Sequence, residues 1–186
     1  HLPDKFDDEG NLSEGTQYQE ESNYKELYEE FLKECESTRN GVDINDNYCR
    51  YYVYDFENDG TPEILVEDGT CEGDRRIEVF GIRDGKVKSL GNFESIHTGL
   101  VASDDFAYKG LPDDMEHNLY TYEVAVSEDT QMIVKELIIN GDKLEIKEVS
   151  SDDIDKYEGR DTNYRKYYDY DDYSPLDEFE REANKK

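Results

Sequence analysis

The sequence predicts an α+β fold in which an antiparallel sheet of hairpins is covered by one N-terminal amphipathic helix. Apolar residues recur with a helical period near the N-terminus, and from Cys49 onward they recur with the period of strands. The pairs Asp84-Gly85 and Asn140-Gly141 separate such strand-like runs, and both pairs are favoured in tight hairpin turns. One helix followed by a series of hairpins is typical of an antiparallel sheet with a helix packed on it.

The helix is expected to begin at Tyr24 and to end near Ser37, before Asn40-Gly41. Asn23 can cap it, and Glu26 three residues later completes a capping-box pattern. Six residues spaced three or four apart form a single apolar stripe: Tyr24, Leu27, Tyr28, Phe31, Leu32 and Cys35. Since amphipathic helices usually cover their own core, we expect this stripe to pack on the sheet rather than to bind a partner.

Three hairpins follow the helix, because each is a pair of apolar, β-branched or aromatic runs around a turn signal. Their strands are 49–54 with 64–66, 76–82 with 86–90, and 132–139 with 143–149. A further strand is expected at 119–126, a short one at Leu100-Val101, and a last one from the tyrosines of 167–173. Ser151 can cap a turn of helix that reaches Tyr157.

This pattern predicts a single α+β domain over residues 22–175, since 186 residues are enough for one domain with a core. Residues 1–21 are acidic, glycine-punctuated and without a period, so we expect a flexible arm there. Residues 176–186 form a charged run, which we expect to be a frayed, solvated tail.

The charge is strongly acidic, because 49 acidic residues oppose 21 basic ones and give a net charge of -28. Such a chain repels itself, so cations should stabilise its compact state. The same charge opposes binding to nucleic acids and to anionic lipid surfaces. We therefore expect no nucleic-acid partner.

The segment Asp55 to Glu63 has the spacing of a calcium loop. Acidic residues stand at loop positions 1, 3, 5 and 9, and Gly60 at position 6 permits a sharp turn. The backbone carbonyl of the residue at position 7 would add one more oxygen. The predicted calcium ligands are Asp55, Glu57, Asp59, Thr61 and Glu63. The alternative is a plain hairpin turn whose carboxylates only contact water.

Position 12 of this loop is Val66, and a strand follows it, so the segment is not an EF-hand. The stretch Asp55 to Val66 instead resembles the calcium hairpins of FG-GAP and VCBS repeats, in which Asp-x-Asp/Asn-x-Asp-Gly-x-x-Asp precedes an apolar strand. It departs from that pattern at Glu57 and Glu63, where shorter side chains are usual. The resemblance implies a calcium-binding hairpin.

The order of elements carries a second, looser resemblance. A tyrosine-rich helix, the calcium hairpin and then Thr70-Cys71-Glu72 before a second hairpin is similar to uncharacterised secreted or lipid-anchored proteins of Gram-positive gut bacteria. That resemblance implies export and brings no known activity. Because the chain begins with His1, we expect a trimmed product, and any attachment to a membrane would be through an N-terminal anchor that has been removed.

Three cysteines leave the redox state open. With a turn centred near Asp59-Gly60, residues whose numbers sum to about 120 would face each other, which favours a Cys49–Cys71 disulfide. The alternatives are a bridge from Cys35 to either of these, or three reduced thiols.

No catalytic residue is assigned. His97 lies near Glu94, Asp104 and Asp105, but no partner nucleophile is in view. We therefore expect an extracytoplasmic binding domain for a protein or glycan at the cell surface, with a structural calcium loop. The alternative is a secreted hydrolase or accessory domain with a carboxylate-lined cleft around 94–116.

Overall fold

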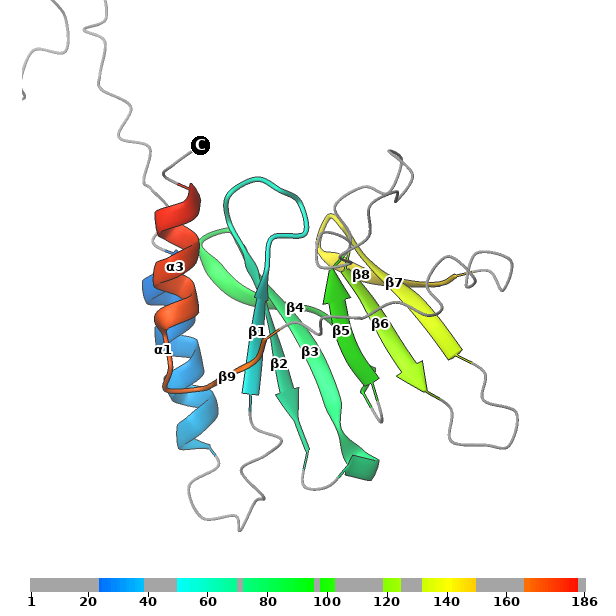
Figure 1. Cartoon of the computed structure of the whole chain (residues 1–186). Coiled ribbons are helices and arrows are strands. Elements are labelled where there is room, and N and C mark those ends of the chain that lie inside the picture. Colours follow the sequence, from blue (N-terminus) through cyan, green and yellow to red (C-terminus); the bar gives the residue numbers. More distant parts are fainter. Residues whose placement is uncertain are drawn as a thin grey trace, which may run out of the picture.

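The computed structural model describes residues 24–38, 50–69, 72–95, 98–102, 119–124, 132–149 and 166–183. These residues form antiparallel sheets and two α-helices, which confirms the predicted α+β class (Figure 1). The elements are α1 Tyr24–Ser37, β1 Arg50–Tyr54, β2 Glu63–Asp68, η2 Glu72–Asp74, β3 Arg76–Arg83, β4 Lys86–Glu94, β5 Thr98–Ala102, β6 Leu119–Val124, β7 Met132–Asn140, β8 Lys143–Glu148, β9 Tyr168–Asp169 and α3 Ser174–Ala183. The predicted arm at 1–21 and the helical turn at 151–157 lie outside the described residues.

The described strands form two sheets rather than the single sheet predicted. One sheet has the order β4-β3-β2-β1-β9 and the other β5-β6-β7-β8. The three predicted hairpins are confirmed as β1 with β2, β3 with β4, and β7 with β8. Two sheets form because both faces of β1 and β2 are apolar, so that each face needs a layer against it.

The first core lies between the two sheets. Its buried residues alternate along the strands, as one face of each sheet requires. From the five-stranded sheet they are Tyr52, Tyr54, Leu65, Ile77, Val79 and Leu90, and from the other sheet Leu100, Leu119, Leu137 and Leu144. The sheets approach closely at Gly91, where an added Cβ would lie 2.9 Å from the Cβ of Leu144.

The second core lies on the opposite face of the five-stranded sheet, on the side of α1 and α3 (Figure 1). The strand residues between those of the first core now point the other way. This cluster contains Tyr51, Val53, Ile64 and Val66 from the strands, Tyr28 and Leu32 from α1, Leu176 from α3, and Tyr170. The hairpin of β1 and β2 is therefore buried on both faces, which explains its nearly continuous apolar sequence.

The segment expected to be a solvated tail contributes to this second core. Leu176 is fully buried and Phe179, one turn later, packs against the same cluster. Pro175 lies in the first turn of α3, where its missing N–H removes no helical hydrogen bond. The predicted boundary at residue 175 thus falls inside α3. Leu176 and Phe179, its two large apolar residues, were too few to reveal a stripe within a charged run.

A buried ion cluster lies in the hairpin of β1 and β2, here called the central hairpin. It is at the end opposite the loop that joins these two strands. The side chain of Glu67 is 0% exposed, and its Oε2 accepts hydrogen bonds from Arg50 Nε at 2.6 Å and Tyr52 Oη at 3.0 Å. Its Oε1 accepts Arg75 Nε at 2.6 Å and pairs with Arg75 Nη2. Arg50 also lies 3.9 Å from the ring centroid of Tyr167. One carboxylate therefore joins β1, β2 and the residue before β3.

The register of the central hairpin differs from the expected one. Tyr54 pairs with Glu63 and Arg50 with Glu67, so opposed residue numbers sum to 117 rather than about 120. The turn is centred one to two residues earlier than predicted. The register argument for a Cys49–Cys71 bridge is therefore wrong by three residues. Both cysteines lie outside the described residues, so their pairing stays a prediction.

Candidate metal site

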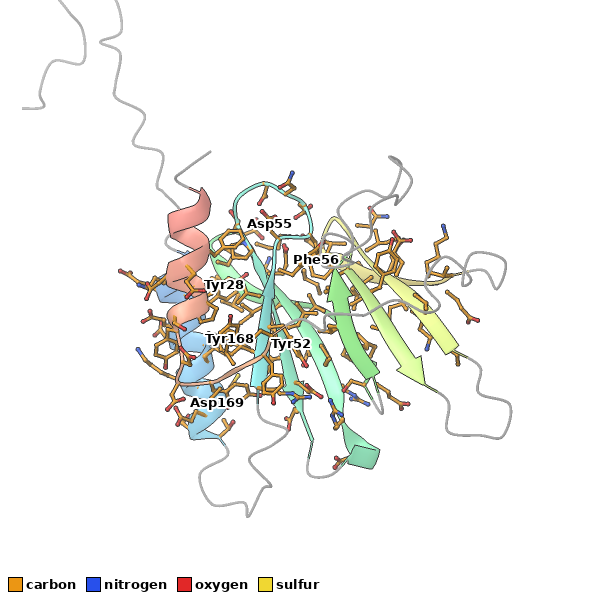
Figure 2. The ribbon with its side chains drawn as sticks, in the orientation of Figure 1. Tyr28, Tyr52, Asp55, Phe56, Tyr168 and Asp169 are labelled. Atoms are coloured by element: carbon orange, nitrogen blue, oxygen red, sulfur yellow. The ribbon has the colours of Figure 1, made fainter. Side chains whose placement is uncertain are left out.

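The predicted calcium loop connects β1 to β2 at one end of the central hairpin. Figure 2 shows Asp55 and Phe56 where the loop leaves β1, with Tyr52 further along the strand. Two loop residues adopt left-handed backbone conformations, Asn58 with φ 51° and Gly60 with φ 89°. Glycine adopts this conformation without strain, and asparagine tolerates it better than most residues. The glycine at loop position 6 thus makes the sharp turn that the motif requires.

Asp55 fastens the loop from within. Its Oδ1 accepts the N–H of Asp59 at 3.2 Å, and its Oδ2 accepts the N–H of Gly60 at 3.0 Å. Asp59 in turn accepts the N–H of Thr61 at 2.8 Å. A carboxylate offers about four acceptor positions, so neither hydrogen bond exhausts an oxygen of Asp55. Asp55 can therefore hold the loop and still coordinate a cation.

Glu63 fastens the other end of the loop. Its side chain is 2% exposed, and its Oε2 accepts the N–H of Phe56 at 3.1 Å. The hydroxyl of Tyr28, from α1, donates to the carbonyl oxygen of the preceding Pro62 at 2.7 Å. Burial, followed by the nearby charge of Glu63, raises the pKa of Tyr28, which keeps its hydroxyl protonated as a donor.

Arg83, at the end of β3, belongs to this site and was not anticipated. Its Nη2 lies 2.9 Å from Glu57 Oε2 and 3.6 Å from Glu63 Oε1. The pairing register of β2 with β3 would have indicated Arg83. In that register Ile64 pairs with Phe80, which places Gly81 beside Glu63. Arg83 shares a strand face with Gly81, which has no side chain to obstruct it.

The electrostatics of the site favour a cation. The pKa of Glu63 is raised to about 7, chiefly by burial and to a smaller extent by the charges of Glu57 and Asp55. The Phe56 N–H and Arg83 act in the opposite direction. The charge balance of the site is therefore acidic. One guanidinium, that of Arg83, stands against four acidic side chains: Asp55, Glu57, Asp59 and Glu63.

The donor set suits calcium in kind, because every predicted ligand supplies oxygen. Within the described part of the chain, however, no three His, Cys, Asp or Glu side chains form a group that could hold a metal ion. Glu57 instead faces Arg83, and Asp59 faces the backbone of Thr61. The residues that would hold calcium are the predicted ones, Asp55, Glu57, Asp59 and Glu63 through carboxylate oxygens and Thr61 through its carbonyl oxygen.

Comparison with protein-family models, with curated proteins and with solved structures finds no match for this chain. Within the described ranges, no helix is both long and apolar enough to cross a membrane. The histidine considered for acid/base chemistry, His97, and its neighbours Asp104 and Asp105 lie outside the described residues. Among the predicted sites, the calcium loop is therefore the one whose residues all lie in the described part of the chain.

We expect Glu63 to make the free energy of unfolding fall as pH rises from about 4.5 to about 7, measured with a chelator present. Its native pKa of about 7 exceeds the ordinary 4.5, so between these values the native state binds more protons than the unfolded chain. The contribution of Glu63 is fully present below its ordinary pKa and is lost as pH rises through the native one, at up to about 1.4 kcal/mol per pH unit.

The measurement is urea denaturation of the wild type and of Glu63→Gln at several pH values across this window. Glutamine does not titrate, so the variant should lack this part of the pH dependence, and the difference between the two proteins isolates Glu63. Identical pH dependence in the two proteins would contradict the raised pKa.

Proposed function

We propose that this chain is an extracytoplasmic interaction domain in which the loop between β1 and β2 binds calcium as a structural ion. The supporting observation is that two buried carboxylates, Asp55 and Glu63, fasten both ends of a loop with four carboxylates and one guanidinium. The proposed ligands are Asp55, Glu57, Asp59 and Glu63 through their side chains and Thr61 through its carbonyl oxygen. Export rests on the sequence resemblance.

A bound calcium ion would neutralise carboxylate charge at the end of a hairpin that is buried on both faces. The loop is also tied to α1 through the hydrogen bond from Tyr28 to Pro62. The proposal therefore includes the covering of the sheet by the N-terminal helix, since an ordered loop holds Pro62 in place for Tyr28. In this proposal calcium orders the domain, and a surface of the ordered domain binds a protein or a glycan.

We expect calcium to raise the melting temperature of the wild type. Binding to the native state adds about 2.7 kcal/mol to the free energy of unfolding when free calcium is a hundredfold above Kd. Asp59→Ala should lose most of this gain, because it removes one carboxylate of the loop. Asp171→Ala removes an equal charge from an exposed turn and serves as the matched control.

Thermal denaturation at increasing calcium, with magnesium in parallel, measures this effect. An equal rise in the wild type and in Asp59→Ala would mean that calcium acts elsewhere or through general screening. A rise in the wild type and the control alone supports the loop.

The alternative is a hydrolase with a carboxylate-lined cleft, and the observation that favours it lies elsewhere than the predicted cleft around 94–116, because the described cavity is lined by other residues. A cavity of about 480 Å³ lies beside the C-terminal end of α1, and three carboxylates, Asp68, Asp74 and Glu78, line it together with Arg76. It adjoins the end of β2 that lies away from the calcium loop. Hydrolysis of a glycan or peptide library by the wild type and not by Glu78→Gln would favour this alternative.

A further inference from the structure

Arg83 spans the space between the calcium loop and the second sheet. One edge of its guanidinium contacts the loop, with Nη2 2.9 Å from Glu57 Oε2. The same nitrogen lies 3.2 Å from the carbonyl oxygen of Gly141, and Nε lies 3.1 Å from Asp142 Oδ1, both in the turn between β7 and β8. Arginine has five donors in a planar fork, so it can hold both partners together.

The local backbone leaves room for this side chain. A Cβ added at Gly81 would lie 3.1 Å from Arg83 Nη1 and 2.9 Å from Leu90 Cδ1. Arg83 Nη1 also donates to the carbonyl oxygen of Ile82 at 3.0 Å, which fixes the orientation of the fork. The side chain is 18% exposed, whereas Asp142 is 73% exposed. The guanidinium is thus held against the loop, and its contact with the β7–β8 turn is the more solvated one.

We propose that Arg83 is the internal counter-cation of this loop, and that calcium must displace its guanidinium from Glu57 and Glu63 in order to bind. This inference rests on the proposed calcium loop. The carboxylates that Arg83 contacts are two of the four side chains that calcium would need. Two cations cannot share the same oxygens at close range without strong repulsion. Arg83 therefore sets the calcium affinity.

Displacement also links calcium to the second sheet. Once it has left Glu57 and Glu63, the guanidinium keeps Gly141 and Asp142 as its partners, because these belong to a different turn. Occupation of the loop should then change the surroundings of the β7–β8 turn, although neither Gly141 nor Asp142 is a predicted ligand. By reciprocity, changes at that turn should alter calcium affinity to the same degree.

The test is the calcium Kd of the wild type, Arg83→Gln and Arg76→Gln by titration calorimetry. Arg76 is an exposed arginine at the other end of β3, so its variant changes net charge equally without touching the loop. Removing a charge-assisted contact that calcium must otherwise break should lower Kd about tenfold in Arg83→Gln. Arg76→Gln should change Kd by less than about threefold, as long-range charge is screened.

Amide resonances give a second readout of the same displacement. In the wild type, calcium should shift the resonances of Gly141 and Asp142, and in Arg83→Gln these shifts should vanish while those of the loop remain. Equal Kd values for Arg83→Gln and Arg76→Gln, with tight binding in the wild type, would overturn the role of Arg83 and leave the calcium loop standing. Absence of binding in the wild type and in Arg83→Gln would overturn both proposals.

Arg83→Lys keeps the comparison decisive if Arg83→Gln fails to fold. Its single ammonium retains the charge but cannot hold Glu57 and the Gly141 carbonyl together in the way the fork does. Its Kd should be lower than that of the wild type. A Kd that is unchanged or higher than in the wild type would contradict the displacement of Arg83.

Discussion

Replacement of Glu67 by alanine should lower the free energy of unfolding by about 3–5 kcal/mol. Glu67 is fully buried and is hydrogen-bonded by Arg50, Arg75 and Tyr52. Its removal leaves the guanidinium groups of Arg50 and Arg75, which are 16% and 8% exposed, without this carboxylate. The cost of one buried and one partly buried charge that lose their common counter-ion exceeds that of the lost side-chain packing.

Urea denaturation with a chelator present measures this loss. Glu148→Ala, at an exposed position of β8, is the matched control and should change the free energy of unfolding by less than about 0.5 kcal/mol. A loss below about 1 kcal/mol in Glu67→Ala would mean that water replaces the carboxylate. In that case the cluster would not hold β1, β2 and Arg75 together.

Leu176→Ala should lower the free energy of unfolding by about 2–5 kcal/mol, the range for a fully buried leucine. Leu176 lies in the core between α3 and the sheet, with Tyr28, Leu32 and Tyr51 in the same cluster. The substitution leaves a cavity there. It does not weaken the helix itself, since alanine has the highest helix propensity.

Glu178→Ala changes an exposed residue of the same helix and controls for effects on α3 alone. If both variants unfolded at the same urea concentration as the wild type, the helix would be a frayed tail, as the sequence suggested. A loss confined to Leu176→Ala supports its place in the core.

Much of the sheet could be predicted, because the signals for hairpins are local. Asp84-Gly85 and Asn140-Gly141 mark their turns, and Asp84, Gly85 and Gly141 adopt the positive φ that such turns require. The division into two sheets could not be predicted, since it depends on which strand faces which layer. Alternation along one strand tells which residues share a face, and not what lies opposite.

The loop carboxylates could be predicted for the same reason, since their spacing is contiguous in sequence. Arg83 and Glu67 could not, because their partners come from other strands. In the sequence, the run Val-Glu-Asp-Gly makes Glu67 look like the polar end of a strand. Its burial as an ion depends on the pairing with Arg50 and on the approach of Arg75, which only the structure shows. An error of three residues in the hairpin register was enough to conceal this contact.

The place of β9 beside β1 has a consequence for how the chain folds. Tyr51 pairs with Tyr168, and its hydroxyl donates to the carbonyl oxygen of Asp172, 121 residues away. Closure of so long a loop is slow, and topologies rich in such contacts fold slowly. Until β9 and α3 arrive, β1 is a sheet edge with exposed apolar residues that can pair with another chain. A chain cut before residue 166 should therefore aggregate, although it retains every residue of the calcium loop.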